Sequence, residues 1–413
     1  MKKIVFALIM VLSVLPIFST DSIDFSGYYK SFFLVFDPID NPLENSNSLT
    51  GVISNHIRFD FSYKSSDKFS LNIAYDFIPK IENRTGLPIT SDILNYTSSY
   101  RAYDLNKILL PSGYSKSSGG NFAVYQNLDR AFMKLSFNFA DIYVGRQAIS
   151  WGSGKLANPT DIFAPFSFNE LDKEERRGID AVRVRIPVGN LAEIDSGYVF
   201  GDRLKLSNSG FFLRSKFFML DTDISFMIIG FKNNLLLGFD LTKPIGGAGF
   251  WFEGAYVKNN FYNKDKDEIP DNYTRISTGL DYNYKGVYMM IEYHYNGAGS
   301  KLPREYYDLF GKRAYKTNTI FLMGINYLSI MTSYQITGLL SNTNMIIYNI
   351  TDKSMILSPK FEYNIAENIY LSLGAFISTG KIPYYSSCFV PPEIKSEFGM
   401  YPNMFFTSFR VYF

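Results

Sequence analysis

The stretch "ISNHIRFDFSY", residues 53–63, alternates apolar and polar side chains. One face carries Ile53, Ile57, Phe59, Phe61 and Tyr63, the other carries Ser54, His56, Arg58, Asp60 and Ser62, and only Asn55 breaks the pattern. A period of two is typical of a β-strand whose two faces meet different surroundings. After a short turn at 65–67, "FSLNIAYDF" (69–77) repeats the alternation, so the two segments predict a β-hairpin.

The first twenty residues, "MKKIVFALIMVLSVLPIFST", combine two lysines with a short apolar run and small polar residues. This pattern predicts a secretory signal peptide over 1–20, followed by one domain over 21–413. Two of the 41 basic residues are Lys2 and Lys3, so the mature chain would balance 39 bases against 39 acids. Such a balance gives no support for a nucleic-acid partner. The single cysteine, Cys388, has no intramolecular disulfide partner.

Aromatic residues are abundant, with 38 Phe and 31 Tyr, and no apolar stretch after the signal is long enough for a transmembrane helix. An exported, strand-rich chain of this kind predicts an all-β fold, a transmembrane antiparallel up-and-down β-barrel in the cell outer membrane. The alternation predicts about 18 strands (16–18), which start near Phe25, Val52, Lys68, Asp129, Asp141, Gly178, Leu191, Ser209, Asp221, Asn234, Ala248, Tyr273, Gly286, Asn318, Ser329, Met355, Asn368 and Met404.

The links between the predicted strands alternate in length. One set is short throughout and includes "LS" at 328–329; the other set is mostly long, at 37–51, 80–121, 152–177, 258–272, 297–317, 341–353 and 379–402. Short periplasmic turns and long extracellular loops are the asymmetry of outer-membrane barrels. A soluble β-sandwich or propeller is the alternative, but it would not place Phe or Tyr outward at nearly every strand end.

The final segment, "FFTSFRVYF" (405–413), alternates aromatic residues and ends in Phe413. It resembles the carboxy-terminal signature of bacterial outer-membrane proteins, and that resemblance implies recognition by the barrel-insertion machinery. The barrel itself implies contact with outer-membrane lipid and lipopolysaccharide. Both a monomer and a trimer remain open.

The segment "GRQAISWGSGK" (145–155) looks like a phosphate-binding turn, but Ile149 stands where such a motif needs glycine, and Leu156 follows Lys155 in place of Ser or Thr. We expect Trp151 at the membrane rim. The link 152–177 carries four large apolar residues, Ile162, Phe163, Phe166 and Phe168. An outer loop exposed to water would not need them, so we predict that this third outer loop folds into the lumen.

The string GRQ-x-I-x-WG-x-G-x(3)-NPTD-x-F-x-P, within residues 145–180, resembles one in poorly characterised porin-like outer-membrane proteins of Gram-negative bacteria. The link 152–177 also resembles the inward constriction loop of general porins. These resemblances imply a porin-like channel for passive diffusion of small solutes, and they name no particular solute.

Charged residues at inward positions are the candidate pore lining, because a charge facing lipid costs about 2–4 kcal/mol at the midplane. The predicted pore-lining and constriction residues are Arg130, Lys134, Arg146, Lys155, Asp161, Arg176, Arg183, Arg185, Glu193, Asp195, Arg214 and Lys216. The seven bases at strand positions form a basic ladder on one wall, with Glu193 and Asp195 between them: Arg130, Lys134, Arg146, Arg183, Arg185, Arg214 and Lys216. The other wall is more acidic, with Asp223, Glu253, Asp281, Glu292 and Glu362 and the bases Arg275, Lys360 and Arg410.

Two interpretations of these charges compete. Opposed walls would create a transverse field across a constriction and select among polar or charged solutes. Alternatively, the charges pair and hold a plugged barrel rigid. We favour the pore, because eighteen strands enclose more volume than side chains alone fill.

Other functions have weaker support in the sequence. A hydrolase would depend on His56 with Asp60, but no nucleophile and base pattern is visible, so we expect no enzyme, no catalytic residue and no cofactor. The acidic segment 263–272 lacks the glycine and terminal glutamate of a calcium loop, and no metal site is expected. A surface-interaction or polysaccharide-associated assembly barrel, with 80–121 and 379–402 as its binding surface, is the alternative function.

Overall fold

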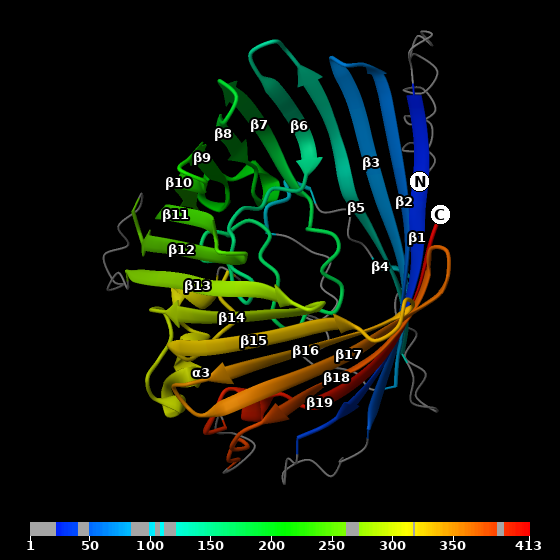
Figure 1. Ribbon diagram of the computed structural model, residues 1–413, viewed down its shortest axis with the longest axis vertical. Helices are drawn as coiled ribbons and strands as arrows, with labels where there is room; N and C mark the ends of the chain where they lie inside the picture. Colours follow the sequence, from blue (N-terminus) through cyan, green and yellow to red (C-terminus); the bar gives the residue numbers. More distant parts are fainter. Residues whose placement is uncertain are drawn as a thin grey trace.

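The computed structural model describes residues 22–39, 49–83, 99–103, 108–110, 121–261, 272–316, 319–385 and 392–413. Eighteen antiparallel strands, each paired with the next, form a closed barrel (Figure 1). Closure comes from β19 (Asn403–Tyr412), which pairs with β1 (Ser22–Asp37) over ten residue pairs. The predicted fold class and strand number are confirmed.

The remaining barrel strands are β2 (Thr50–Ser66), β3 (Phe69–Glu82), β5 (Asn121–Ser136), β6 (Asp141–Gln147), β7 (Ile179–Val188), β8 (Ala192–Val199), β9 (Gly210–Met219), β10 (Thr222–Phe231), β11 (Asn234–Ile245), β12 (Ala248–Lys258), β13 (Tyr273–Tyr284), β14 (Val287–Asn296), β15 (Asn326–Gln335), β16 (Leu340–Asn349), β17 (Ser354–Ala366) and β18 (Ile369–Thr379). A short strand, β4 (Ile108–Leu110), pairs with Tyr125 and Val124 of β5 and is not counted among the eighteen barrel strands. The helical turns are η1 (Asp202–Leu204), η2 (Leu206–Asn208), η3 (Pro303–Glu305), α3 (Tyr306–Leu309), α4 (Arg313–Lys316) and η4 (Phe398–Met400). No helix in the described part of the chain has both the length and the apolar character needed to cross a bilayer.

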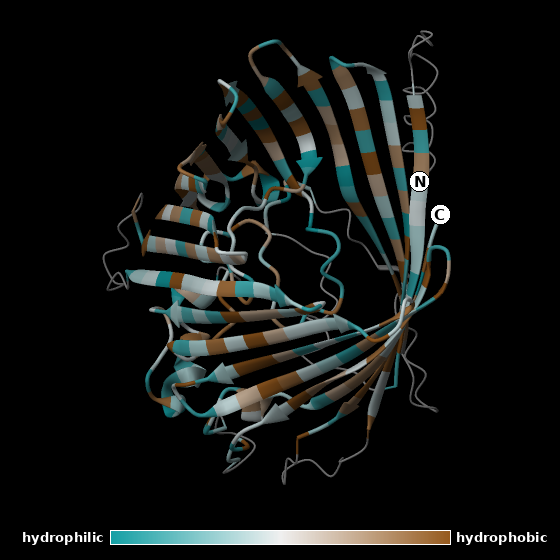
Figure 2. Cartoon of the chain, viewed as in Figure 1, coloured by the Kyte–Doolittle hydropathy of each residue, from teal (hydrophilic) through white to brown (hydrophobic). Residues whose placement is uncertain are grey.

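Side chains alternate between the inside and the outside of the barrel. On β1, Lys30 and Leu34 point inward and are fully buried, whereas Phe25 and Phe33 point outward and are 62% and 49% exposed. Figure 2 shows the same alternation as polar and apolar bands along the strands. The exposed outward aromatics and aliphatics form the surface that lipid would cover.

The two ends of the barrel differ. The end that we call the turn end carries short links such as Leu220 and Asp221, whose φ angles of 54° and 56° suit a type I′ hairpin turn. Both ends of the described chain also lie there, because Ser22 pairs with Lys64 and Phe413 bonds to Gly27. The opposite end, the loop end, carries the long links.

Two strand boundaries near the predicted "LS" turn were wrong. A single strand, β15, runs through 328–329, and the turn lies at 336–339 instead. Residues 319–325 are a short apolar run that can be taken for a strand, but they form an irregular segment in which Ile320, Leu322 and Met323 are buried inside the barrel. These apolar side chains are therefore buried in a loop and not in a barrel strand. The loop 297–325 is longer than predicted, and the link 350–353 is short.

β5 begins at Asn121, eight residues before the predicted start. Its pairing with β3 shifts by one residue, because Ala74 faces Arg130 and Tyr75 faces Leu128. Asp129 is the extra residue of this bulge. The bulge lets Asp129 and Arg130 both contribute to charge pairs inside the barrel.

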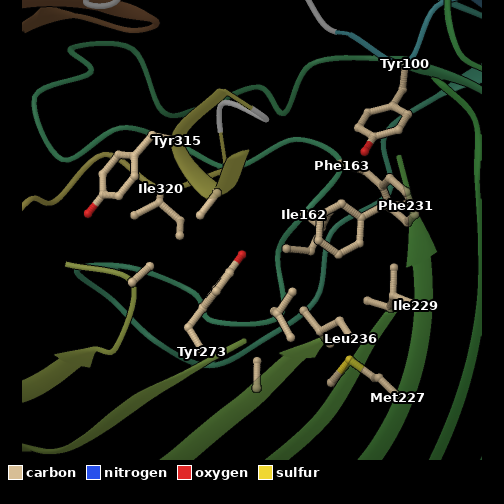
Figure 3. Close-up of a cluster of buried hydrophobic side chains, with 14 of the residues drawn as sticks. Tyr100, Ile162, Phe163, Met227, Ile229, Phe231, Leu236, Tyr273, Tyr315 and Ile320 are labelled. Atoms are coloured by element: carbon tan, nitrogen blue, oxygen red, sulfur yellow. The ribbon is translucent and has the colours of Figure 1, made fainter. Parts of the chain in front are cut away.

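The lumen at the loop end contains a hydrophobic core. Tyr100, Ile162 and Phe163 from the loops meet strand residues that point inward, including Ile229 and Phe231 (Figure 3). Further buried members come from the 297–325 loop, among them Tyr306, Leu309 and Ile320. The loops therefore fold as one packed body within the barrel mouth.

Several predictions fall on residues outside the described ranges. They are the signal peptide 1–20, most of the segment 80–121, the acidic segment 263–271 and residues 386–391 of the last long loop.

Candidate functional site

The segment 148–178, which joins β6 to β7, lies inside the barrel (Figure 1). Just before the segment, Arg146 on β6 bonds to two neighbouring strands: its Nε donates to Asp180 Oδ1 on β7 at 2.7 Å, and its Nη1 donates to the Leu128 carbonyl on β5 at 2.8 Å. Arg146 is 6% exposed. This predicted pore-lining arginine is therefore buried and cross-links β5, β6 and β7.

Trp151 lies in the lumen core, so its predicted place at the membrane rim was wrong. Its indole ring packs 4.7 Å from the Phe212 ring, and its Nε1 donates to Asp195 Oδ2 at 3.2 Å. The inward loop carries the tryptophan away from the barrel rim, where the sequence position alone would place it.

Residues 152–160, which we call the strap, cross the inner face of β11 to β14. Glu253 accepts the N–H groups of Gly154 and Thr160, both at 2.8 Å, and the Thr160 hydroxyl at 2.7 Å. Glu292 accepts the N–H groups of Lys155 and Leu156 at 2.7 and 2.8 Å. The strap thus binds two carboxylates of the barrel wall through its backbone.

Gly152 makes this approach possible. Its φ of +96° is strained for other residues, and a Cβ atom there would lie 2.5 Å from Glu253 Oε1. The glycine turn that looks like a phosphate-binding turn therefore binds carboxylates of the protein itself, those of Glu253 and Glu292. Successive backbone N–H groups in a turn can bind a carboxylate as well as a phosphate.

The far part of the loop is fixed to the opposite side of the barrel. Lys30 Nζ on β1 donates to Asp172 at 2.9 Å and to Glu174 at 2.7 Å. Arg410 and Tyr412 on β19 also donate to Glu174, at 2.7 and 2.8 Å. The loop therefore spans the lumen from β11–β14 to β1 and β19.

Within the loop, Asp161 and Arg176 form an ion pair. Asp161 also accepts the Ser150 hydroxyl at 3.0 Å, and the Arg176 guanidinium lies 3.9 Å from the centre of the Phe166 ring. Burial raises the pKa of Asp161, and the nearby Arg176 opposes that shift. These two predicted constriction residues hold the loop's own shape.

The predicted basic ladder is paired with carboxylates along its length. The pairs are Arg130 with Asp129 and Glu175, Lys134 with Asp141, Arg183 with Asp195, Arg185 with Glu193, Arg214 with Glu193, and Lys216 with Asp223. Most partners stand on neighbouring strands, where cross-strand pairs are close. The ladder is therefore neutralised locally.

The predicted acidic wall is compensated as well. Glu362 pairs with Arg410 and Lys360, and Asp281 accepts the Tyr288 hydroxyl at 2.9 Å. Glu253 and Glu292 bind the strap. For these residues the geometry favours charge compensation over a transverse field between two open walls.

Lys155 is in a different position from the ladder. It is exposed, its Nζ lies 5.7 Å from the Trp251 ring, and it forms no ion pair with a carboxylate among the described residues. It lines two cavities. One lies between the strap and residues 319–322, and the other lies at the turn end beside Asp223 and Asp281.

The cavity toward the loop end has a mainly basic and aromatic lining. Its charged and aromatic residues are Lys155, Asp161, Phe166, Phe168, Lys173, Arg176, Arg275, His294 and Phe321. Arg275 is 4% exposed, and its Nε has no hydrogen-bond partner among the described residues. The sequence pattern places Arg275 on the acidic wall and does not indicate Lys173 as a lining residue. The cavity that both residues line is formed by segments far apart in the chain, which the pattern does not bring together.

The structure does not bring His56 and Asp60 together. His56 Nε2 lies 3.2 Å from Asp76 Oδ1, while Asp60 accepts Arg58 Nε at 3.0 Å. Arg58 also pairs with Asp129 at 3.0 Å. The two residues of the hydrolase alternative therefore have different carboxylate and guanidinium partners, and of the two only His56 is buried.

An 18-stranded antiparallel barrel with an apolar exterior and an inward loop is the architecture of outer-membrane porins. Solved structures share this fold. OccK5 (OpdH) of Pseudomonas aeruginosa has a TM-score of 0.58 at 8% identity and covers 95% of this chain and 98% of its own. A BenF-like porin of Pseudomonas fluorescens Pf-5 has a TM-score of 0.56 at 10% identity, with 95% and 98% covered. OccAB1 of Acinetobacter baumannii has a TM-score of 0.53 at 9% identity, with 95% and 96% covered.

No protein-family model matches the sequence, and no curated protein matches it. The likeness to solved structures establishes the fold.

Proposed function

We propose that the protein is an outer-membrane channel for passive diffusion of small polar or charged solutes, and that the inward loop forms its constriction. The fold shared with porins supports this proposal, as does the exterior of exposed apolar side chains. Export through the signal peptide 1–20 and recognition of the Phe413 strand by the insertion machinery belong to the same proposal.

The observation that carries the proposal is the position of Lys155 between two cavities. The strap separates the cavity toward the loop end from the cavity at the turn end, and Lys155 lines both. A solute that passes from one to the other meets an exposed ammonium group. The predicted ladder residues are already paired, and among the described residues Lys155 is the base that lines both cavities.

Planar-bilayer recording of the purified protein tests the proposal. We expect stepwise conductance, and we expect Lys155→Glu to shift the reversal potential in a salt gradient toward cation preference. Lys285→Glu makes the same charge change on an exposed turn-end residue and should leave selectivity unchanged. Absence of conductance steps would favour a plugged barrel, and equal effects of the two variants would remove Lys155 from the solute path.

A further inference from the structure

We propose that Glu253 and Glu292 are positioning residues of the constriction. Together they clamp the strap through its backbone N–H groups and thereby set the gap that Lys155 occupies. The proposal rests on the channel function proposed above and adds the device that holds the constriction in place.

The first argument is the burial of the two carboxylates. Both are 0% exposed, and neither forms an ion pair with a base among the described residues. Each is met by three donors: Gly154 N–H and both groups of Thr160 for Glu253, and Lys155 N–H, Leu156 N–H and Trp251 Nε1–H for Glu292. Buried carboxylates need such partners, so removal of the strap would leave Glu253 with none of these donors and Glu292 with only the Trp251 indole.

The second argument is the strand register, which lines up the residues that hold the strap. Asp240 on β11 faces Glu253 on β12, Glu253 faces Ser277 on β13, and Ser277 faces His294 on β14. Along this row, Asp240 accepts the Ser153 hydroxyl, and the Ser277 hydroxyl donates to the Ala157 carbonyl at 2.8 Å. The strap therefore follows one row of inward residues across four strands.

The third argument is the support behind Glu292. Trp251 faces Gly279, and Gly279 faces Glu292, so the three residues form the adjacent row. A Cβ atom on Gly279 would lie 2.3 Å from the Trp251 ring. The glycine leaves room for the indole to reach across β13 and donate to Glu292 Oε2 at 2.8 Å. This bond orients the carboxylate toward the strap.

The clamp acts on the loop and not on the barrel itself. The ladders between β11, β12, β13 and β14 are continuous without either side chain. In contrast, the amides of Gly154, Lys155 and Leu156 find their acceptors only on the two carboxylates among the described residues. Loss of the clamp should therefore free the strap while the barrel stays closed.

Replacement of glutamate by glutamine separates charge from size. A glutamine side chain offers one acceptor oxygen and two additional N–H donors, and it would face three donors that already point inward. Glu253→Gln and Glu292→Gln should therefore weaken the clamp although they fill nearly the same volume. Glu367→Gln, on an exposed turn at the turn end, is the matched control.

The test uses the full chain with Cys388→Ser, which removes the only cysteine, and with Ala157→Cys as a reporter on the strap, because the strap is held there through the Ala157 carbonyl and not through its side chain. In detergent micelles, labelling by a bulky maleimide should be about tenfold faster in the Glu253→Gln/Glu292→Gln double variant, as a loss of about 1.4 kcal/mol of strap binding would give. In bilayers, the double variant should show larger and more variable conductance steps, and the selectivity effect of Lys155→Glu should fall. The Glu367→Gln control should match the parent.

Heat-modified migration on gels verifies that each barrel is folded before the comparison. If the double variant does not fold, Thr160→Val removes only one hydroxyl donor from Glu253 and should still accelerate labelling. Unchanged labelling in the folded variants overturns the clamp. The labelling test does not depend on conduction, so a parent protein that conducts nothing would refute the channel while the clamp is judged separately.

Discussion

The wall formed by β5–β9 and the wall formed by β11–β14 both place charged residues inside the barrel, and they compensate those charges in different ways. On β7 and β8, Arg183 meets Asp195 on the neighbouring strand at 2.6 Å. On β12 and β14, Glu253 and Glu292 meet the backbone of a loop. The first wall is neutralised by local ion pairs, whereas the two carboxylates of the second wall have their full set of hydrogen-bond donors only while the loop is in place. The second wall is therefore the one that links barrel and constriction.

The largest expected effect tests the first wall. Asp195 is fully buried and accepts bonds from Arg183 and Trp151. Asp195→Ala should destabilise the protein by about 3–5 kcal/mol, because it leaves a mostly buried arginine without its partner. Thermal unfolding, followed by heat-modified migration, measures the change. The double variant Arg183→Met/Asp195→Leu should recover most of the stability, and a double variant as unstable as the single one would contradict local pairing as the main interaction.

The next effect tests the second wall. Gly152→Val places a branched side chain at a φ of +96° and against the Glu253 carboxylate. Backbone strain of about 1–3 kcal/mol, in addition to the steric clash, should release the strap and accelerate maleimide labelling at Ala157→Cys. Gly246→Val is the control, because Gly246 also has a positive φ, of +57°, but no atom lies within 4 Å of the place that a Cβ atom would take there. Equal labelling in both variants would show that the contact with Glu253 does not hold the strap.

A third prediction concerns a buried carboxyl in another loop at the loop end. Glu397 accepts the Met323 N–H at 3.0 Å and Asn349 Nδ2 at 2.7 Å, and burial raises its pKa from 4.5 to about 7. The folded protein then binds this proton more tightly than the unfolded chain. The stability contributed by protonated Glu397 is full below pH 4.5 and is lost as the pH rises toward 7, by about 1 kcal/mol per unit at most.

Glu397→Gln should remove this pH dependence. The measurement is the unfolding temperature of parent and variant between about pH 4.5 and 8, and the difference between them should change with pH. Parallel curves would show that another group causes any observed dependence. This experiment does not test the clamp, because Glu397 bonds to Met323 and Asn349 and not to the strap.

The smallest effect concerns a base at the edge of the first wall, Lys216 on β9, and its partner on β10. Lys216 and Asp223 form a pair at 3.0 Å in which both side chains are 42% exposed. The charge swap Lys216→Asp/Asp223→Lys should change stability by less than about 1 kcal/mol, as expected for an exposed pair. The reversal potential should also stay constant, because the pair keeps its net charge. A clear shift in selectivity would mean that individual ladder charges, and not their pairs, act on solutes.

Much of the architecture could be predicted because barrel strands carry their pattern locally. The alternation around Phe59 and the apolar group Ile162, Phe163 and Phe168 indicate the barrel and the need to bury the third loop. The prediction failed at 319–325, where a short apolar run in an irregular segment imitates a strand. It also failed for Trp151, because the depth of a loop residue depends on where the loop goes.

The candidate site was harder to predict. Arg183 and Asp195 could be paired by interleaving on adjacent strands, since their separation along the chain is short. Glu253 and Glu292 lie about a hundred residues or more from Gly154 and Lys155, and their partners are backbone amides, which have no signature in the sequence. The same limit applies to Arg275, whose cavity is closed by residues from several separate loops and strands.

The sequence alone determined that the chain forms a closed barrel with an apolar exterior, because a period of two records the two environments of every strand. It also determined that charges face the lumen, because lipid excludes them. Only the tertiary structure decided which of those charges remain open to solutes. That outcome depends on the path of one loop across the lumen. Glu253 and Glu292 hold the strap of this loop in place, and they bond to its backbone amides, not to side chains of the opposite wall.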